Sequence, residues 1–207
     1  MQPCAHRHVR AHWWDGHKDG VSCRTQRDPL VPGSWPEWTV LVSGDACGDR
    51  PIIRTAVEAD LPELQVVFRA AALSNAGDVP ALLARPEYLV FTGEGIAEGR
   101  TRVAIAVVDG PDRLTGFATL TRGPDGQPDL EDLFVDPRCR RQGIARRLIH
   151  DAASIARRAG HRTITVTGNQ HALAFYRAVG FVEIGQAETE LGPAPRLRLE
   201  LTDEHRP

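Results

Sequence analysis

A long amphipathic helix in the last third of the chain is the feature that most constrains the fold. Between Arg141 and Arg158, apolar residues recur at the spacing of one helical face: Ile144, Leu148, Ala152, Ile155 and Ala159. Gly160 follows, at a position where glycine commonly ends a helix. Such an apolar stripe must cover another apolar surface, and the strand-like segments on both sides of the helix predict that this surface is a sheet.

The remaining segments alternate between strand and helix character. Strands are expected at 52–54, 102–108, 113–121, 129–135, 163–167, from Phe181 onward, and at 196–201. Further helices are expected after Asp60, at 79–84, and from Asn169 to Val179, with Asp60 and Glu63 forming a capping box. This order predicts an α/β (α+β) fold with a mixed, mostly antiparallel central sheet flanked by helices.

The first fifty residues differ from the rest. They hold all four tryptophans and four of the eight histidines of the 207-residue chain, without helical or strand periodicity. We expect a poorly ordered or atypical N-terminal extension over 1–50 and one domain over 51–207. A cluster there contains Cys4, His6, His8, His12, His17 and Cys23. It lacks the paired spacing of structural zinc ligands, so we expect no metal site.

Composition restricts the partners. With 27 acidic against 25 basic residues and a formal net charge of -2, the chain has no long-range field that would gather nucleic acid or an anionic membrane. The sequence contains no apolar run of membrane-spanning length, and its N-terminus lacks the apolar region of a signal peptide. We therefore expect a cytoplasmic protein with reduced thiols, no nucleic-acid partner and no membrane contact.

The connection from 136 to 145 carries the first chemical signal. It runs from the strand at 129–135 into the long helix, whose N-terminus offers unpaired N–H groups and a partial positive charge. Gly143 would let the backbone approach a ligand, and several arginines add charge, which favours a site for a diphosphate. An arginine-rich first turn is also common on solvated helix faces, and both the dinucleotide and the P-loop fingerprints are absent.

Two motifs resemble the GCN5-related N-acetyltransferase (GNAT) superfamily. Residues 140–145, Arg-Arg-Gln-Gly-Ile-Ala, resemble its Q/R-x-x-G-x-G/A signature, with Ala145 where many relatives have glycine. A second motif, roughly N-x-x-A-x-x-F-Y-x-x-x-G-F, is matched by Asn169, Ala172, Ala174, Phe175, Tyr176, Gly180 and Phe181. The resemblance covers about 52–201 in element order, and its specific part is about 129–182.

The resemblance implies an acyl-CoA N-acyltransferase fold and acetyl-CoA as co-substrate. In the family, the strand equivalent to 129–135 splays from the next parallel strand and exposes backbone groups to the pantetheine arm, while amides of the following turn hold the pyrophosphate. The residues expected to bind the cofactor are Phe134, Val135, Arg140, Arg141, Gln142, Gly143, Ile144, Ala145, Arg146, Asn169, Phe175 and Tyr176.

The same resemblance suggests catalytic residues. Tyr176 matches the family's usual acid, although Phe175 and Tyr176 could equally be core aromatics. Asp129 and Glu131 are candidates for the general base, because residues two apart on a regular strand share a face; the alternative is that both are solvent-facing charges. His171 is also near the expected site, but a histidine in a first helical turn is more often a surface residue.

The function expected from the resemblance is acetyl transfer from CoA to a primary amine, direct and within a ternary complex. The acceptor, a small molecule or a peptide, is expected over 79–99 and 185–195, which contain Arg85, Glu87, Glu94, Glu98, Glu188 and Glu190. The alternative is a non-catalytic acyl-CoA-binding regulatory module. A dinucleotide-binding or nucleic-acid protein is disfavoured by the missing fingerprint and balanced charge. A homodimer is possible.

Overall fold

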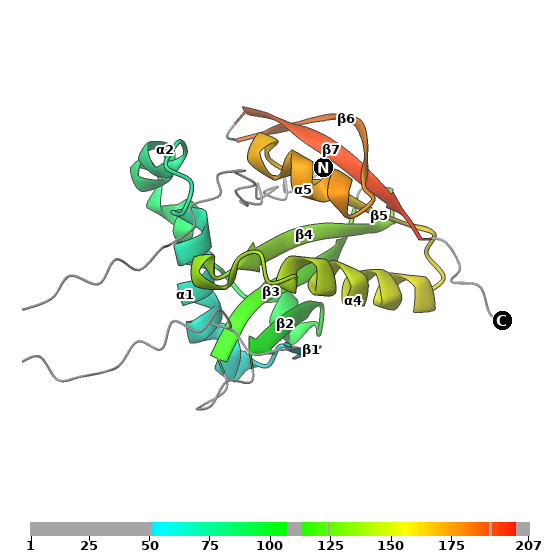
Figure 1. Cartoon of the computed structure of the whole chain (residues 1–207), viewed down its shortest axis with the longest axis horizontal. Coiled ribbons are helices and arrows are strands. Elements are labelled where there is room, and N and C mark those ends of the chain that lie inside the picture. Colours follow the sequence, from blue (N-terminus) through cyan, green and yellow to red (C-terminus); the bar gives the residue numbers. More distant parts are fainter. Residues whose placement is uncertain (1–50, 107–112, 124, 191, 202–207) are drawn as a thin grey trace, which may run out of the picture.

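The computed structural model describes residues 51–106, 113–123, 125–190 and 192–201, which fold into a seven-stranded sheet with helices packed against it (Figure 1). The strand order is β1-β2-β3-β4-β5-β7-β6. Only the pair β4–β5 is parallel, and the other neighbouring strands are antiparallel. The predicted fold class is therefore confirmed.

The strands are β1 (Ile52–Thr55), β2 (Thr101–Ala106), β3 (Arg113–Arg122), β4 (Pro128–Val135), β5 (Thr163–Thr167), β6 (Val182–Thr189) and β7 (Gly192–Glu200). The α-helices are α1 (Leu61–Ala72), α2 (Val79–Ala84), α3 (Glu94–Ala97), α4 (Ile144–Arg158) and α5 (Leu173–Ala178). Short 3-10 turns are η1 (Glu58–Asp60), η2 (Pro86–Leu89), η3 (Pro137–Cys139) and η4 (Gln170–Ala172). The sequence pattern missed the one-turn helix α3.

Two hydrophobic cores lie on opposite faces of the sheet. Leu133 of β4 belongs to the core under α4, where Leu148 is fully buried. Phe134, the next residue along β4, belongs to the core under α1, where its ring lies 4.8 Å from that of Phe68 in a T-shaped arrangement. Because side chains alternate along a strand, β4 is packed on both faces. Its position is thus fixed by both cores.

The helix predicted after Asp60 is present, but the predicted capping box is wrong. The Asp60 carboxylate accepts hydrogen bonds from Arg54 at 2.7 and 2.8 Å and from the Val57 amide at 2.8 Å. The Glu63 carboxylate accepts a bond from the Leu114 amide at 2.9 Å. Both carboxylates serve tertiary contacts, because an arginine and an unpaired strand amide lie within reach and satisfy them.

Three further expectations concern membrane spans, the N-terminal cysteine and histidine cluster, and the thiols. Within the described ranges, no helix combines the length and apolar character needed to span a bilayer. The cysteine and histidine cluster of the first fifty residues lies outside the described part of the chain. Cys139 is buried and disulfide-bonded, so the expectation of reduced thiols is wrong at this position.

Replacing Phe134 with alanine tests whether β4 is held by both cores. We expect Phe134→Ala to lower the free energy of unfolding by about 3–5 kcal/mol, because a fully buried aromatic ring leaves a cavity. Val66→Ala, at a valine of α1 that is 61% exposed, is the control and should change stability by less than about 0.5 kcal/mol. Urea unfolding measures both, and equal effects of the two changes would contradict the packing described.

Candidate active site

The parallel strands β4 and β5 stay paired over a very short distance. Their ladder consists of two registered pairs, Asp129 with Thr165 and Leu130 with Val166. β4 continues to Val135 after this ladder has ended, while the chain leaving β5 turns into η4 and α5. The end of the ladder therefore marks a point where two adjacent strands are followed by loops on the same side of the sheet, a common location for ligand sites.

A strained turn follows β4. Asp136 ends the strand, and its carboxylate accepts bonds from the amide and the guanidinium of Arg138, at 2.9 and 2.6 Å. Burial raises the pKa of Asp136, but these bonds and the Arg138 charge outweigh burial and hold the pKa below its ordinary value. Arg141 then adopts φ 65°, the only positive φ of a non-glycine residue in the described ranges, and Gly143 adopts φ 76°. Such backbone strain concentrates at functional sites.

Helix α4 begins at Ile144, three residues later than predicted, because Arg141 and Gly143 lie in the left-handed region. Arg147 donates to the Gly143 carbonyl at 3.0 Å, which closes the first helical turn. By their position in the first turn, the N–H groups of Ile144, Ala145 and Arg146 have no helical acceptor. Their dipoles favour a bound anion.

The surroundings of this turn fit a diphosphate. A Cβ placed on Gly143 would meet no heavy atom within 4 Å, so the space in front of the turn is open. The side chains of Arg141 and Arg146 are exposed and can approach an anion. Arg140 is differently placed, since its guanidinium donates to the Ser74 hydroxyl between α1 and α2.

Tyr176 of α5 is 1% exposed and lies close to the end of the β4–β5 ladder. Its ring packs against Phe175 and Phe181, with centroids 5.4 and 5.3 Å away. Burial, and secondarily the negative charge of Asp129, raise its pKa above the ordinary value for tyrosine. A neutral phenol at neutral pH can donate a proton or a hydrogen bond to a ligand.

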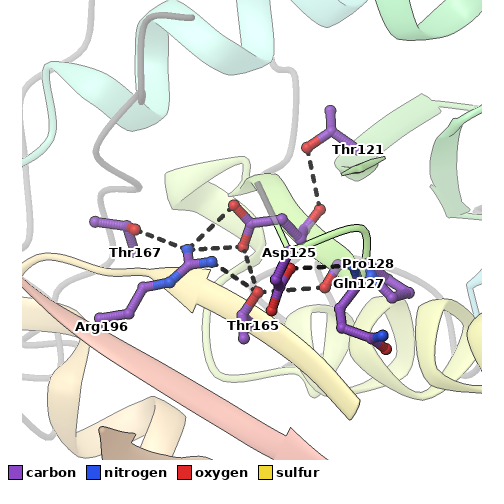
Figure 2. A network of polar contacts seen from close by, with 8 residues as sticks. Thr121, Asp125, Gln127, Pro128, Thr165, Thr167 and Arg196 are labelled. Carbon is purple, nitrogen blue, oxygen red and sulfur yellow. Dashed lines mark hydrogen bonds and ion pairs between the residues drawn. The ribbon is translucent and has the colours of Figure 1, made fainter. Parts of the chain in front are cut away.

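Asp129 lies within a polar network that joins β4, β5 and β7. Figure 2 shows the Arg196 side chain extending between Thr165 and Thr167. Arg196 Nη1 donates to both Asp129 carboxylate oxygens, at 2.8 and 3.1 Å, and to Thr167 Oγ1 at 2.9 Å. Arg196 Nη2 donates to Thr165 Oγ1 at 2.8 Å, and Thr165 Oγ1 lies 3.0 Å from Asp129 Oδ1. The alternative of a solvent-facing charge therefore does not fit Asp129, which forms a largely shielded ion pair with Arg196.

Opposing effects act on the pKa of Asp129. Burial raises the pKa most, the positive charge of Arg196 and the hydrogen bonds from Thr165 and Arg196 lower it, and the charge of Asp125 raises it slightly. The net effect is a raised pKa. A carboxylate whose pKa is raised toward neutrality is a stronger base than one at a solvated surface.

Glu131 departs from the regular alternation assumed for β4. The pairing with β3 passes from Thr119↔Asp132 to Leu120↔Leu130, so Glu131 is the extra residue of a β-bulge. Accordingly, Leu130 shares the α4-side core with Leu133, an odd number of residues away. A spacing of two therefore does not place Asp129 and Glu131 on one face.

Two other expected residues lie in the segment that follows β5. Asn169 caps η4, with its Oδ1 accepting from the Ala172 amide at 2.7 Å, as predicted. Its Nδ2 is buried and has no hydrogen-bond partner among the described residues. His171 is 49% exposed, and its Nε2 lies 3.9 Å from Asp78 Oδ2. Burial raises the pKa of Asp78, and the His171 charge opposes that rise.

The two segments expected to bind the acceptor come together. Tyr88 of η2 donates its hydroxyl to Glu190, which follows β6, and Arg85 donates to the Tyr88 hydroxyl at 2.7 Å. The backbone at Leu89 and Phe91 is fixed to α1 through Gln65, with two bonds of 2.7 Å. Residues 102 positions apart in the sequence thus meet in the fold.

Sequence reasoning missed Arg196, Thr165 and Thr167. The relevant signal was the alternation Thr163-Ile164-Thr165-Val166-Thr167, which directs hydroxyls to one face and aliphatic side chains to the other. Nothing in the sequence distinguishes Arg196 from Arg198, two residues along the same strand, although the first is buried in the network and the second is exposed. Both arginines lie between β5 and β6, and they differ in their partners, since Arg196 pairs with Asp129 of β4 and Arg198 pairs with Glu200 of its own strand.

A family comparison matches residues 91–192 to the model described as an acetyltransferase (GNAT) domain. The matched range contains β4, the turn before α4, and Tyr176.

Curated relatives point the same way. The peptidyl-lysine N-acetyltransferase YjaB of Salmonella typhimurium is 37% identical over 97 residues, covering 46% of this chain and 61% of that protein. The N-alpha-acetyltransferase RimI of Mycobacterium tuberculosis is 36% identical over 70 residues, covering 34% and 44%. The chain thus spans less than two thirds of the length of these relatives.

Solved structures agree in fold. A GCN5-related N-acetyltransferase from Rhodopseudomonas palustris superposes with a TM-score of 0.55 at 18% identity, covering 74% of this chain and 97% of that one. The PaiA N-acetyltransferase of Thermoplasma acidophilum, in complex with coenzyme A, also gives 0.55 at 18% identity, covering 72% and 98%.

The contact between Gly168 and Tyr176 tests the placement of the phenol. A Cβ at Gly168 would lie 2.8 Å from Tyr176 Cε2, so we expect Gly168→Ala to displace the ring and cost about 1–3 kcal/mol of unfolding free energy. Gly77→Ala, at an exposed glycine whose added Cβ would approach nothing closer than 3.6 Å, is the matched control. Thermal unfolding and near-UV circular dichroism would report both. A Gly168→Ala protein as stable as the control would contradict this packing.

Proposed function

The chain carries an acetyltransferase domain of the GNAT family, and we propose that it moves an acetyl group from acetyl-CoA to a primary amine, directly and in a ternary complex. The observation that carries this proposal is that two features border the same core, which contains Ile144, Ala145 and Tyr176. One is the turn before α4, with its left-handed Arg141 and Gly143, and the other is the buried Tyr176. We further propose that the domain extends over 51–207.

The turn before α4 is proposed to hold the cofactor diphosphate. The amides of residues 141–146 and the exposed guanidinium groups of Arg141 and Arg146 would bind its oxygens, and the open space at Gly143 supports this assignment. The backbone of Phe134 and Val135 would contact the pantetheine arm. Gln142, Ile144 and Ala145 would line the turn. When bound, acetyl-CoA supplies the activated acetyl group.

Three other proposed cofactor residues differ in how they would act. Arg140 would act from its position beside Ser74, on the α1 side of the opening. Asn169 has a buried Nδ2 with donor capacity to spare, which suits a carbonyl of the cofactor arm. Phe175 is buried against Tyr176, so its contribution would come through packing.

Tyr176 is proposed as the acid that protonates the departing thiolate. Its raised pKa keeps the phenol protonated at neutral pH, so it has a proton to give at its hydroxyl oxygen. Its surroundings exclude water, which strengthens any hydrogen bond that it makes. A place in the core and a role as an acid are compatible, because the ring packs against Phe175 and Phe181 while the charge of Asp129 acts on the phenol.

Asp129 is the stronger of the two proposed proton acceptors. Its charge acts on Tyr176, which supports a position beside the reacting groups, whereas Glu131 sits in a bulge. The acceptor is proposed to be an amine of a peptide or a small molecule. The names of the Salmonella and mycobacterial relatives refer to peptide amines, and the segments joined by Tyr88 and Glu190 would border this substrate.

Binding of acetyl-CoA tests the proposed cradle. We expect wild-type protein to bind it in isothermal titration calorimetry, and Gly143→Glu to weaken binding by about tenfold or more, since a carboxylate at the helix N-terminus repels the diphosphate. Gly126→Glu is the matched control, because Gly126 has φ 77° and equally open surroundings but lies in the β3–β4 turn. Equal losses in both variants, or no binding by folded wild type, would contradict the cradle.

Turnover separates an enzyme from the alternative, a non-catalytic acyl-CoA-binding module. Release of free CoA thiol with a panel of peptide and small-molecule amines should fall roughly 100-fold in kcat for Tyr176→Phe, while acetyl-CoA binding stays within a few-fold. Wild-type rates in the variant, measured where chemistry limits turnover, would remove Tyr176 as the acid. Tight binding without thiol release from wild type, across the panel, would favour the non-catalytic module.

A further inference from the structure

Arg196 is the residue through which β7 reaches the end of the β4–β5 ladder. Its guanidinium makes contacts with three side chains on two other strands, namely Asp129 of β4 and Thr165 and Thr167 of β5. The side chains of Arg196 and Asp129 are each 18% exposed, so solvent screens their charges poorly. A guanidinium in this arrangement fixes both the charge and the direction of the carboxylate it contacts.

We propose that Arg196 is a positioning residue of this site: it holds the Asp129 carboxylate ionised and directed at the ladder end, where the carboxylate can receive a proton from the acceptor amine. This inference rests on the proposed function. In the step concerned, an N–H bond of the ammonium group breaks, its electron pair stays on nitrogen, and the proton passes to an Asp129 oxygen, directly or through water. The neutral amine is then able to attack.

Three charged or titratable groups act on Asp129, and they come from β7, from the β3–β4 turn and from α5. Arg196 of β7 favours the ionised carboxylate, whereas Asp125 of the β3–β4 turn disfavours it. Tyr176 of α5 remains neutral, so it adds no charge. Burial also disfavours ionisation. Arg196 is thus the only positive charge found to act on this carboxylate among the described residues, and its loss should leave Asp129 protonated over a wider pH range.

Thr165 contributes to the same arrangement. Its hydroxyl accepts from Arg196 and can donate its single hydrogen to Asp129 Oδ1 at 3.0 Å or to the Pro128 carbonyl at 3.3 Å. Because Arg196 occupies an acceptor lone pair of the hydroxyl, it directs the hydrogen toward the carboxylate side. A lysine at position 196 would keep the charge but could not reproduce the fork of contacts.

The test compares Arg196→Met and Arg196→Lys with Arg198→Met as the matched control. Arg198 lies two residues along β7, is 48% exposed and pairs with Glu200 at 2.8 Å. We expect the acidic limb of kcat/KM against pH to move upward by about one unit or more in Arg196→Met, which costs about tenfold at a pH below the limb. Arg196→Lys should move the limb less, and Arg198→Met should leave it in place.

A second readout does not depend on activity. The Asp129 carboxyl is titrated by carbon-13 NMR, with its signal assigned from Asp129→Asn, and its midpoint should rise in Arg196→Met but not in Arg198→Met. An unchanged limb and an unchanged titration, in variants that still bind acetyl-CoA and melt cooperatively, would overturn the inference. If wild type bound acetyl-CoA but transferred no acetyl group, the proposed function would fail. An unshifted Asp129 titration in Arg196→Met would separately refute the effect of Arg196 on the Asp129 carboxylate.

Discussion

Packing on both faces of β4 is the constraint on which the rest of the site depends. Leu133 and Phe134 point into different cores, so the strand cannot shift toward either helix without opening a cavity. The point at which its ladder with β5 ends is therefore fixed, and so is the direction in which the chain enters the turn before α4. The position of β4 therefore sets the position of both the proposed diphosphate contacts and the Asp129 carboxylate.

The proposed site contains two separate groups of charges, one at the turn before α4 and one at the Asp129–Arg196 pair. The turn before α4 offers main-chain dipoles and exposed arginines on one side, which suit an anion. The ion pair of Asp129 and Arg196 is neutral overall and largely shielded from solvent. It therefore orients the Asp129 carboxylate and does not attract a ligand by net charge. A chain with a formal net charge of -2 can accordingly offer a local site for an anion without any net attraction over long range.

Periodicity was sufficient to predict the elements, because the apolar stripe of the long helix and the alternation of the strands reflect which faces are buried. The second motif predicted the cap made by Asn169. What failed depended on neighbours distant in sequence. Asp60 pairs with Arg54 instead of capping its helix, and the bulge at Glu131 arises from register with β3. Arg196 could not be distinguished from Arg198, because the partner of Arg196 is Asp129, 67 residues away on β4.

The central place of β4 has a consequence for how the protein moves. Amide hydrogens of a strand that is hydrogen-bonded in mid-sheet and covered by two cores exchange with solvent only when much of the domain opens. The proposed site is thus built on a strand whose amides should exchange slowly, whereas the contact between Tyr88 and Glu190 lies at an exposed position. With β4 rigid beneath the reacting groups and exposed side chains such as Tyr88 and Glu190 bordering the acceptor, different amines could enter without disturbing the chemistry.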